Sequence, residues 1–85
     1  MYRLYCEGTA ALDDADFTKV VEGFIQAGAD GKIFTGPVDG VKGNISAYFK
    51  RKQSAEIAAY AVLAVSEEKS VPVEVDIDNV KMLKI

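Results

Sequence analysis

The side chains in this 85-residue sequence that could do chemistry are carboxylates, tyrosines, lysines and one thiol, because the chain contains no histidine. Histidine is the commonest general base and metal ligand, so its absence removes the simplest routes to acid–base catalysis and metal binding. The single thiol, Cys6, is too few for an iron–sulfur cluster, which needs about four, and we expect it to point into a core. We therefore predict that the protein is not an enzyme and has no cofactor and no small-molecule substrate.

Carboxylates alternate along one segment near the C-terminus, as Glu74, Asp76 and Asp78. Together with Glu7 they would supply oxygen ligands for a hard cation if they met on adjacent strands. Exposed acids that alternate along a strand more commonly keep a surface soluble, and we predict no metal site. The chain has 10 basic and 13 acidic residues, and this net charge of −3 does not favour binding of polyanions by bulk electrostatics.

Hydrophobic periodicity indicates the strands that must position these groups. Period-two alternation predicts four of them, over residues 2–7, 32–38, 41–51 and 71–78. Asp39-Gly40 between two apolar runs predicts a hairpin, and Pro37 suits an edge strand. The tail, residues 79–85, either adds a short edge strand or packs across a helix end.

Two helices are expected between the strands. Asp13 is a suitable N-cap for the first helix, and Gly28 is a suitable C-terminal cap. The apolar residues at helical spacing in this segment are Phe17, Val20, Val21, Phe24 and Ile25. Ser54 is expected to cap the second helix, which should run to about Lys69.

The order of elements is β-α-β-β-α-β, without an internal repeat or a low-complexity linker. Right-handed crossovers lead this order to a four-stranded antiparallel sheet with both helices on one face. We therefore predict an α+β, ferredoxin-like two-layer sandwich formed as a single domain by residues 1–85. The other face of the sheet would be open to solvent or to a partner.

Alternation assigns side chains to the two faces of this sheet. In the first strand Leu4 and Cys6 should point inward and Tyr5 outward. In the third strand the residues expected to point inward are Ile45, Ala47 and Phe49, and those expected to point outward are Asn44, Ser46 and Tyr48.

Several short matches follow the spacing of an RNA-recognition motif. The segment Leu4-Tyr5-Cys6 resembles the first-strand motif of that family, and Lys42-Gly43 with Phe49 resembles parts of its third-strand motif. Matching positions in the second helix and last strand are Ala55, Ala58, Ala61 and Val62, followed by 72–75. The resemblance implies the same fold, with an open sheet face on which family members stack bases.

The departures from this family fall at the stacking positions, which are Asn44 and Ser46 here. Loss of two stacks of about 1–3 kcal/mol each should weaken binding unless Tyr48 replaces one of them. Weak binding of single-stranded RNA or DNA to the open sheet face is therefore an alternative function. Its predicted residues are Tyr5, Asn44, Tyr48 and the basic cluster Lys50, Arg51 and Lys52.

The second helix carries a different signal. If Ala55, Ala58, Ala59 and Val62 face the sheet, the outward side of this helix is apolar where a surface helix normally carries charge. The residues of this outward stripe are Ile57, Tyr60, Ala61 and Ala64. Unless the helix is rotated or the tail covers it, such a stripe indicates contact with another protein or with another copy of the chain. Our leading prediction is a small binding module that regulates or bridges a protein partner, as an inhibitor or as a self-associating adaptor.

The N-terminal segment MYRLYCEG does not have the charged-then-apolar pattern of a signal peptide. No apolar run approaches the roughly 20 residues of a membrane-spanning helix. We expect a cytoplasmic protein that does not enter a membrane, and one cysteine is compatible with a reducing compartment.

Overall fold

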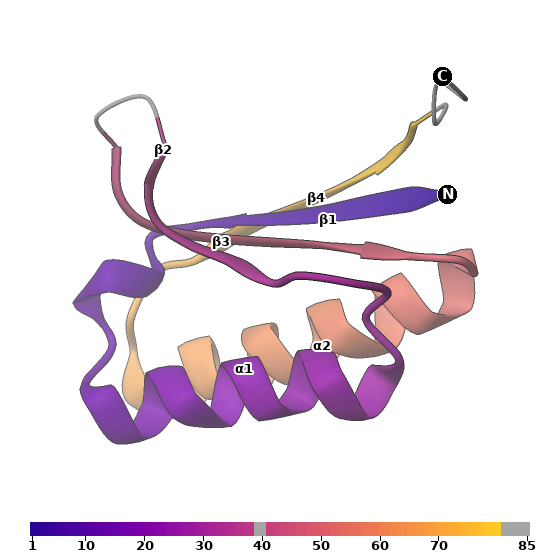
Figure 1. The fold of residues 1–85 in the computed structure, drawn as a ribbon. Helices are drawn as coiled ribbons and strands as arrows, with labels where there is room; N and C mark the ends of the chain where they lie inside the picture. The colour runs from indigo at the N-terminus through magenta and orange to yellow at the C-terminus, as the bar shows by residue number, and fades with distance from the viewer. Residues whose placement is uncertain (39–40, 81–85) are drawn as a thin grey trace.

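The computed structural model describes the backbone of residues 1–38 and 41–80 and the side chains of residues 1–35 and 44–80. Its elements are β1 (Tyr2–Glu7), a 3-10 turn (Thr9–Ala11), α1 (Asp14–Ala27), β2 (Phe34–Val38), β3 (Val41–Phe49), α2 (Lys52–Lys69) and β4 (Glu74–Asn79). The strands form an antiparallel sheet in the order β2-β3-β1-β4. Both helices cover one face of it (Figure 1). The predicted ferredoxin-like sandwich is confirmed. We call the face opposite the helices the open face.

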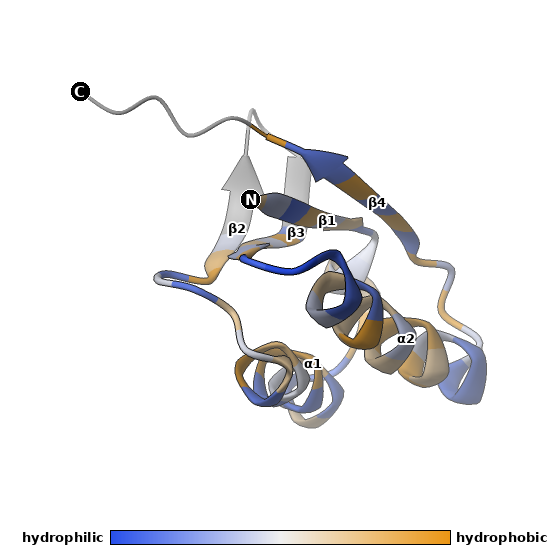
Figure 2. Ribbon diagram, turned by 90° about the vertical axis from the view of Figure 1, so that its right-hand side faces the viewer, coloured by the Kyte–Doolittle hydropathy of each residue, from blue (hydrophilic) through white to orange (hydrophobic). Residues whose placement is uncertain are grey.

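Strand β1 lies between β3 and β4, so each of its inward-facing residues has a neighbouring strand on both sides. Leu4 pairs with Ala47 of β3 and with Ile77 of β4. Leu4 and Cys6 have no exposed surface. Along β4 the hydropathy alternates between hydrophilic and hydrophobic, as period-two pairing on a half-covered sheet requires (Figure 2).

Helix α1 begins and ends at the predicted caps. The carboxylate of Asp13 accepts a hydrogen bond of 2.8 Å from the backbone N–H of Asp16. Gly28 has φ of 98°, in the left-handed region where glycine closes a helix readily. Val20 and Phe24 are fully buried, but Ile25 is 61% exposed and does not belong to the core. Ile25 has the helical spacing of the apolar residues, but it lies at the edge of the helix side that faces the sheet, where the sheet does not cover it.

Helix α2 begins earlier than predicted. Its first residue is Lys52, and Arg51 occupies the N-cap without a side-chain hydrogen bond. The N–H of Ala55 already donates to the carbonyl of Arg51 at 3.3 Å, so Ser54 lies inside the first turn. The prediction of Ser54 as N-cap is wrong, because the chain turns into the helix directly after β3 and needs no separate capping segment.

Several strand boundaries also differ from the prediction. Strand β2 begins two residues late, at Phe34, and β3 ends at Phe49. Strand β4 begins at Glu74, because the N–H of Val71 donates to the carbonyl of Ser66 and so closes the end of α2. The predicted turn residues 39–40 and tail residues 81–85 lie outside the described residues. Of the predicted tail, Asn79 is the last residue of β4, and the N–H of Val80 donates to the carbonyl of Met1 at 2.9 Å. Strand β2 is an edge strand, as Pro37 suggested.

The core lies between the sheet and the helices. Phe24 of α1 and Phe49 of β3 meet edge to face with ring centroids 6.1 Å apart. From α2 the buried side chains are small, so the helix axis can approach the sheet closely. They are Ala55, Ala58, Ala59 and Val62, as predicted. The large apolar side chains of α2 must therefore lie elsewhere.

Candidate interaction surfaces

The outer side of α2 carries exposed apolar side chains on successive turns. Tyr60 is 69% exposed and Ile57 is 53% exposed. Leu63, at 38%, adds to them, and Ala64 is exposed as well. We call Ile57, Tyr60, Leu63 and Ala64 the α2 patch. The sequence interpretation missed Leu63, although Leu63 follows Tyr60 at the i+3 spacing that places residues on neighbouring turns.

Ala61 does not share this exposure. It is half-buried, and a methyl group built on Gly23 of α1 would lie 3.2 Å from its Cβ. Ala61 therefore sits at the contact between the two helices. Its prediction as part of the outward stripe is corrected, because α1 covers the side of α2 on which Ala61 lies.

The open face carries three neighbouring aromatic side chains from three strands. Tyr5 and Phe34 both pair with Ser46 of β3, from opposite sides. Phe34, 46% exposed, meets Tyr48 edge to face with centroids 6.3 Å apart. We call Tyr5, Phe34 and Tyr48 the aromatic cluster. Together with Arg3 and Ser46 it lines a shallow hollow of about 240 Å³.

Phe34 was not among the predicted site residues. Its own strand segment showed that it was apolar, but only the register of β2 against β3 places it beside Tyr48. A regular two-residue hairpin would set Phe34 opposite Ile45, but the register shifts between Gly36 and Val38, so Phe34 pairs with Ser46 instead. The register thus adds an aromatic side chain of β2 to the two tyrosines of the open face.

Asn44 lies on this face but is only 1% exposed. Its Nδ2 donates a hydrogen bond to the hydroxyl of Tyr5, and its Oδ1 has no partner among the described residues. The prediction of Asn44 as a surface contact for nucleic acid is corrected, because its side chain is buried beside Tyr5 and holds the ring in place.

Three acidic residues, Glu7, Glu74 and Asp76, lie next to the aromatic cluster, and we call them the acidic row. Glu7 pairs directly with Glu74, and Tyr5 pairs with Asp76. These four residues and Val75 line an open hollow of about 420 Å³. In the part of the chain that the structure describes, no group of three or more acids, histidines and cysteines is arranged to hold a metal ion.

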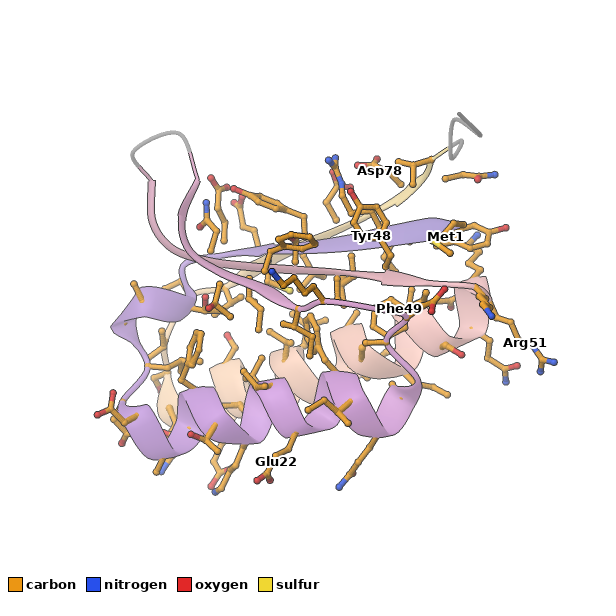
Figure 3. The ribbon with its side chains drawn as sticks, in the orientation of Figure 1. Met1, Glu22, Tyr48, Phe49, Arg51 and Asp78 are labelled. Atoms are coloured by element: carbon orange, nitrogen blue, oxygen red, sulfur yellow. The ribbon has the colours of Figure 1, made fainter. Side chains whose placement is uncertain are left out.

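Arg3 lies on the same strand as Tyr5 and Glu7, and it forms an ion pair across the sheet. Its guanidinium donates to the carboxylate of Asp78 at 2.9 Å across β1 and β4. Figure 3 shows Asp78 and Tyr48 standing on the open face, with Phe49 on the opposite side toward the helices. The described part of the open face therefore presents more negative than positive charge.

The basic cluster lies away from the tyrosines. Lys50, Arg51 and Lys52 are exposed at the connection between β3 and α2. Lys50 and Arg51 border a hollow of about 310 Å³ that Asp30 and the end of α1 also line. In Figure 3 the side chain of Arg51 points away from the molecule beyond the end of the sheet. The structure brings Tyr5 and Tyr48 onto one face but does not place this cluster over them.

Burial explains the state of the one thiol. Desolvation raises the pKa of Cys6 to about 12, so the thiol stays protonated at neutral pH and is a poor nucleophile. It behaves as a small core residue, as predicted.

No model of a known protein family matches the chain, and no curated protein sequence is similar to it. The resemblance to an RNA-recognition motif therefore stays a prediction, while the α+β topology stands on the structure alone. Among the described helices, none is long and apolar enough to cross a membrane.

Proposed function

We propose that this chain is a small non-enzymatic binding module that contacts another protein through the α2 patch, and so regulates or bridges that partner. The observation that carries the proposal is the exposure of Tyr60 and Ile57 on adjacent turns of one helix, at 69% and 53%. Contiguous apolar surface of this kind commonly marks a contact with protein.

The composition of α2 supports this proposal. Its buried side is built from alanines and Val62, while its larger side chains stand in solvent. An amphipathic helix that served only the core would have the opposite arrangement. Full burial of an isoleucine-sized side chain contributes roughly 1.5–3 kcal/mol, so two such side chains at an interface would make a substantial contribution to affinity. Tyrosine is also enriched among residues that dominate binding energy.

The test uses affinity capture from the native host, with nuclease treatment, followed by mass spectrometry. The double variant Ile57→Asp with Tyr60→Asp should lose the captured protein. The matched control is Ile25→Asp, which alters an exposed isoleucine on α1 and should retain it. Sizing of the purified chain over a range of concentrations separates self-association from binding of a different protein. Equal capture by the double variant and the wild type would refute the proposal.

Binding of single-stranded nucleic acid is the second candidate, and the aromatic cluster favours it. A base stacked on an aromatic ring gains about 1–3 kcal/mol, and Phe34 with Tyr48 could supply such platforms. The carboxylates of the acidic row oppose it, since they repel a phosphate backbone. Titration with short oligonucleotides at low and moderate salt decides this point. Binding that weakens with salt and disappears in Tyr5→Ala with Tyr48→Ala would support it, and absence of binding at low salt would exclude it.

A further inference from the structure

We propose that the open face binds an extended segment of a partner protein that carries a positively charged side chain, preferably of arginine, two residues away from an apolar one. This inference goes beyond the proposed function, because the open face and the α2 patch lie in different layers of the molecule (Figure 1). A chain with both surfaces could hold two protein segments at once.

The geometry provides two hollows that share one wall. Tyr5 lines the hollow of about 240 Å³ that contains Phe34 and Tyr48, and it also lines the hollow of about 420 Å³ that contains the acidic row. Alternate side chains of an extended segment point the same way and lie roughly 7 Å apart, which is between one and two strand spacings of about 4.8 Å. Residues at positions i and i+2 of such a segment would therefore reach both hollows.

Charge complementarity selects the first of these residues. The larger hollow is bordered by the carboxylates of Glu7, Glu74 and Asp76, and none of the three forms an ion pair with a cation among the described residues. A guanidinium is planar, presents five N–H donors and binds carboxylates in a bidentate way. It also stacks on an aromatic ring, and Tyr5 is the aromatic wall of this hollow.

The aromatic cluster selects the second residue. Phe34 is nearly half exposed although its ring contacts that of Tyr48, so part of an apolar ring faces solvent. A leucine-sized or aromatic side chain would cover it. A nucleic acid would also stack there, but its phosphates would then lie beside Glu74 and Asp76, which repel them. The observations therefore favour a basic protein segment.

The experiment is an NMR titration of the whole chain with a capped pentapeptide of sequence glycine-arginine-serine-phenylalanine-glycine at low salt. We expect shifts in the amides of β1 and β4. The same peptide with citrulline in place of arginine keeps the shape without the charge and should bind at least about fivefold more weakly. A short oligothymidine is titrated in parallel.

Matched variants locate the site. Glu74→Gln with Asp76→Asn should weaken binding of the arginine peptide about five- to tenfold. Glu67→Gln with Glu68→Gln changes the net charge equally on α2 and should change binding by less than about twofold. The double variant Ile57→Asp with Tyr60→Asp should bind the peptide as the wild type does. Peptide binding therefore tests the open face independently of the partner capture that tests the α2 patch.

Four results would overturn the proposal. They are absence of peptide binding, equal binding of the citrulline peptide, equal weakening by the two charge-removing variants, and stronger binding of oligothymidine than of the peptide at the same amides. The last result would transfer the open face to the nucleic-acid candidate.

Discussion

Replacement of Gly8 by alanine should destabilise the fold more than an ordinary glycine substitution. Gly8 follows β1 and has φ of 94°, in the left-handed region that costs other residues roughly 1–2 kcal/mol. A Cβ built there would lie 2.5 Å from the carbonyl oxygen of Pro72, in the connection that leads from α2 into β4. The clash is with backbone, which cannot move aside as a flexible side chain would.

Gly28→Ala is the matched control. Gly28 has nearly the same φ, 98°, but a Cβ there would meet no atom within 4 Å. Both variants share the left-handed penalty, which is partly offset by about 0.4–1 kcal/mol because alanine restricts the unfolded chain. The difference between them isolates the contact with Pro72, for which overpacking costs of about 1–3 kcal/mol are typical.

Urea and thermal unfolding followed by circular dichroism measure this difference. At about 4–8 °C per kcal/mol for a domain of this size, an extra 2 kcal/mol lowers the Tm of Gly8→Ala by about 8–16 °C relative to Gly28→Ala. If the two variants unfold at the same temperature and urea concentration, the contact between a Cβ at position 8 and the carbonyl of Pro72 costs no stability, and the reasoning is refuted.

Three further predictions concern single side chains. The hydrogen bond from Asp16 holds the pKa of Asp13 below its ordinary value, so Asp13→Ala should lower Tm at neutral pH, and the gap should close as acid protonates the wild-type cap; a constant gap in a pH series of melts would contradict this. Cys6, with its pKa raised to about 12, should react with iodoacetamide at pH 8 far more slowly than in urea, and its contribution to stability should fall as pH rises from about 9 toward 12; equal rates would show that the site is open. Asp78→Asn removes an ion pair whose side chains are 42% and 43% exposed, so unfolding in urea should change by less than about 1 kcal/mol.

The faces of the central strands could be predicted from the sequence because they depend on a local period. Leu4 and Cys6 alternate with Tyr5, and alternate side chains of a strand point to opposite faces of the sheet. The caps of α1 were equally local, since Asp13 and Gly28 act on backbone groups within a few residues. The prediction of Ser54 as the N-cap of α2 was wrong, because a serine near a helix start is a capping signal only if the chain before it is not already helical.

Site features that depend on contacts between distant segments could not be predicted in this way. Phe34 joins the aromatic cluster through the register of β2 on β3, and Asn44 is buried because it lies beside Tyr5. Ala61 and Ala64 are the same residue type on the same helix, and only the position of α1 covers one and leaves the other exposed.

The sequence by itself determined the order of elements, the inward residues of β1 and β3 and the alanine side of α2, because periodicity and capping act over a few neighbouring residues. Tertiary structure alone decided which surface groups meet. It separated the basic cluster from the tyrosines, brought Phe34 to Tyr48 and set the acids of β4 beside Tyr5. The reason is that packing of the whole core fixes the strand register and the positions of the helices. The register and the helix positions then determine which surface residues are neighbours.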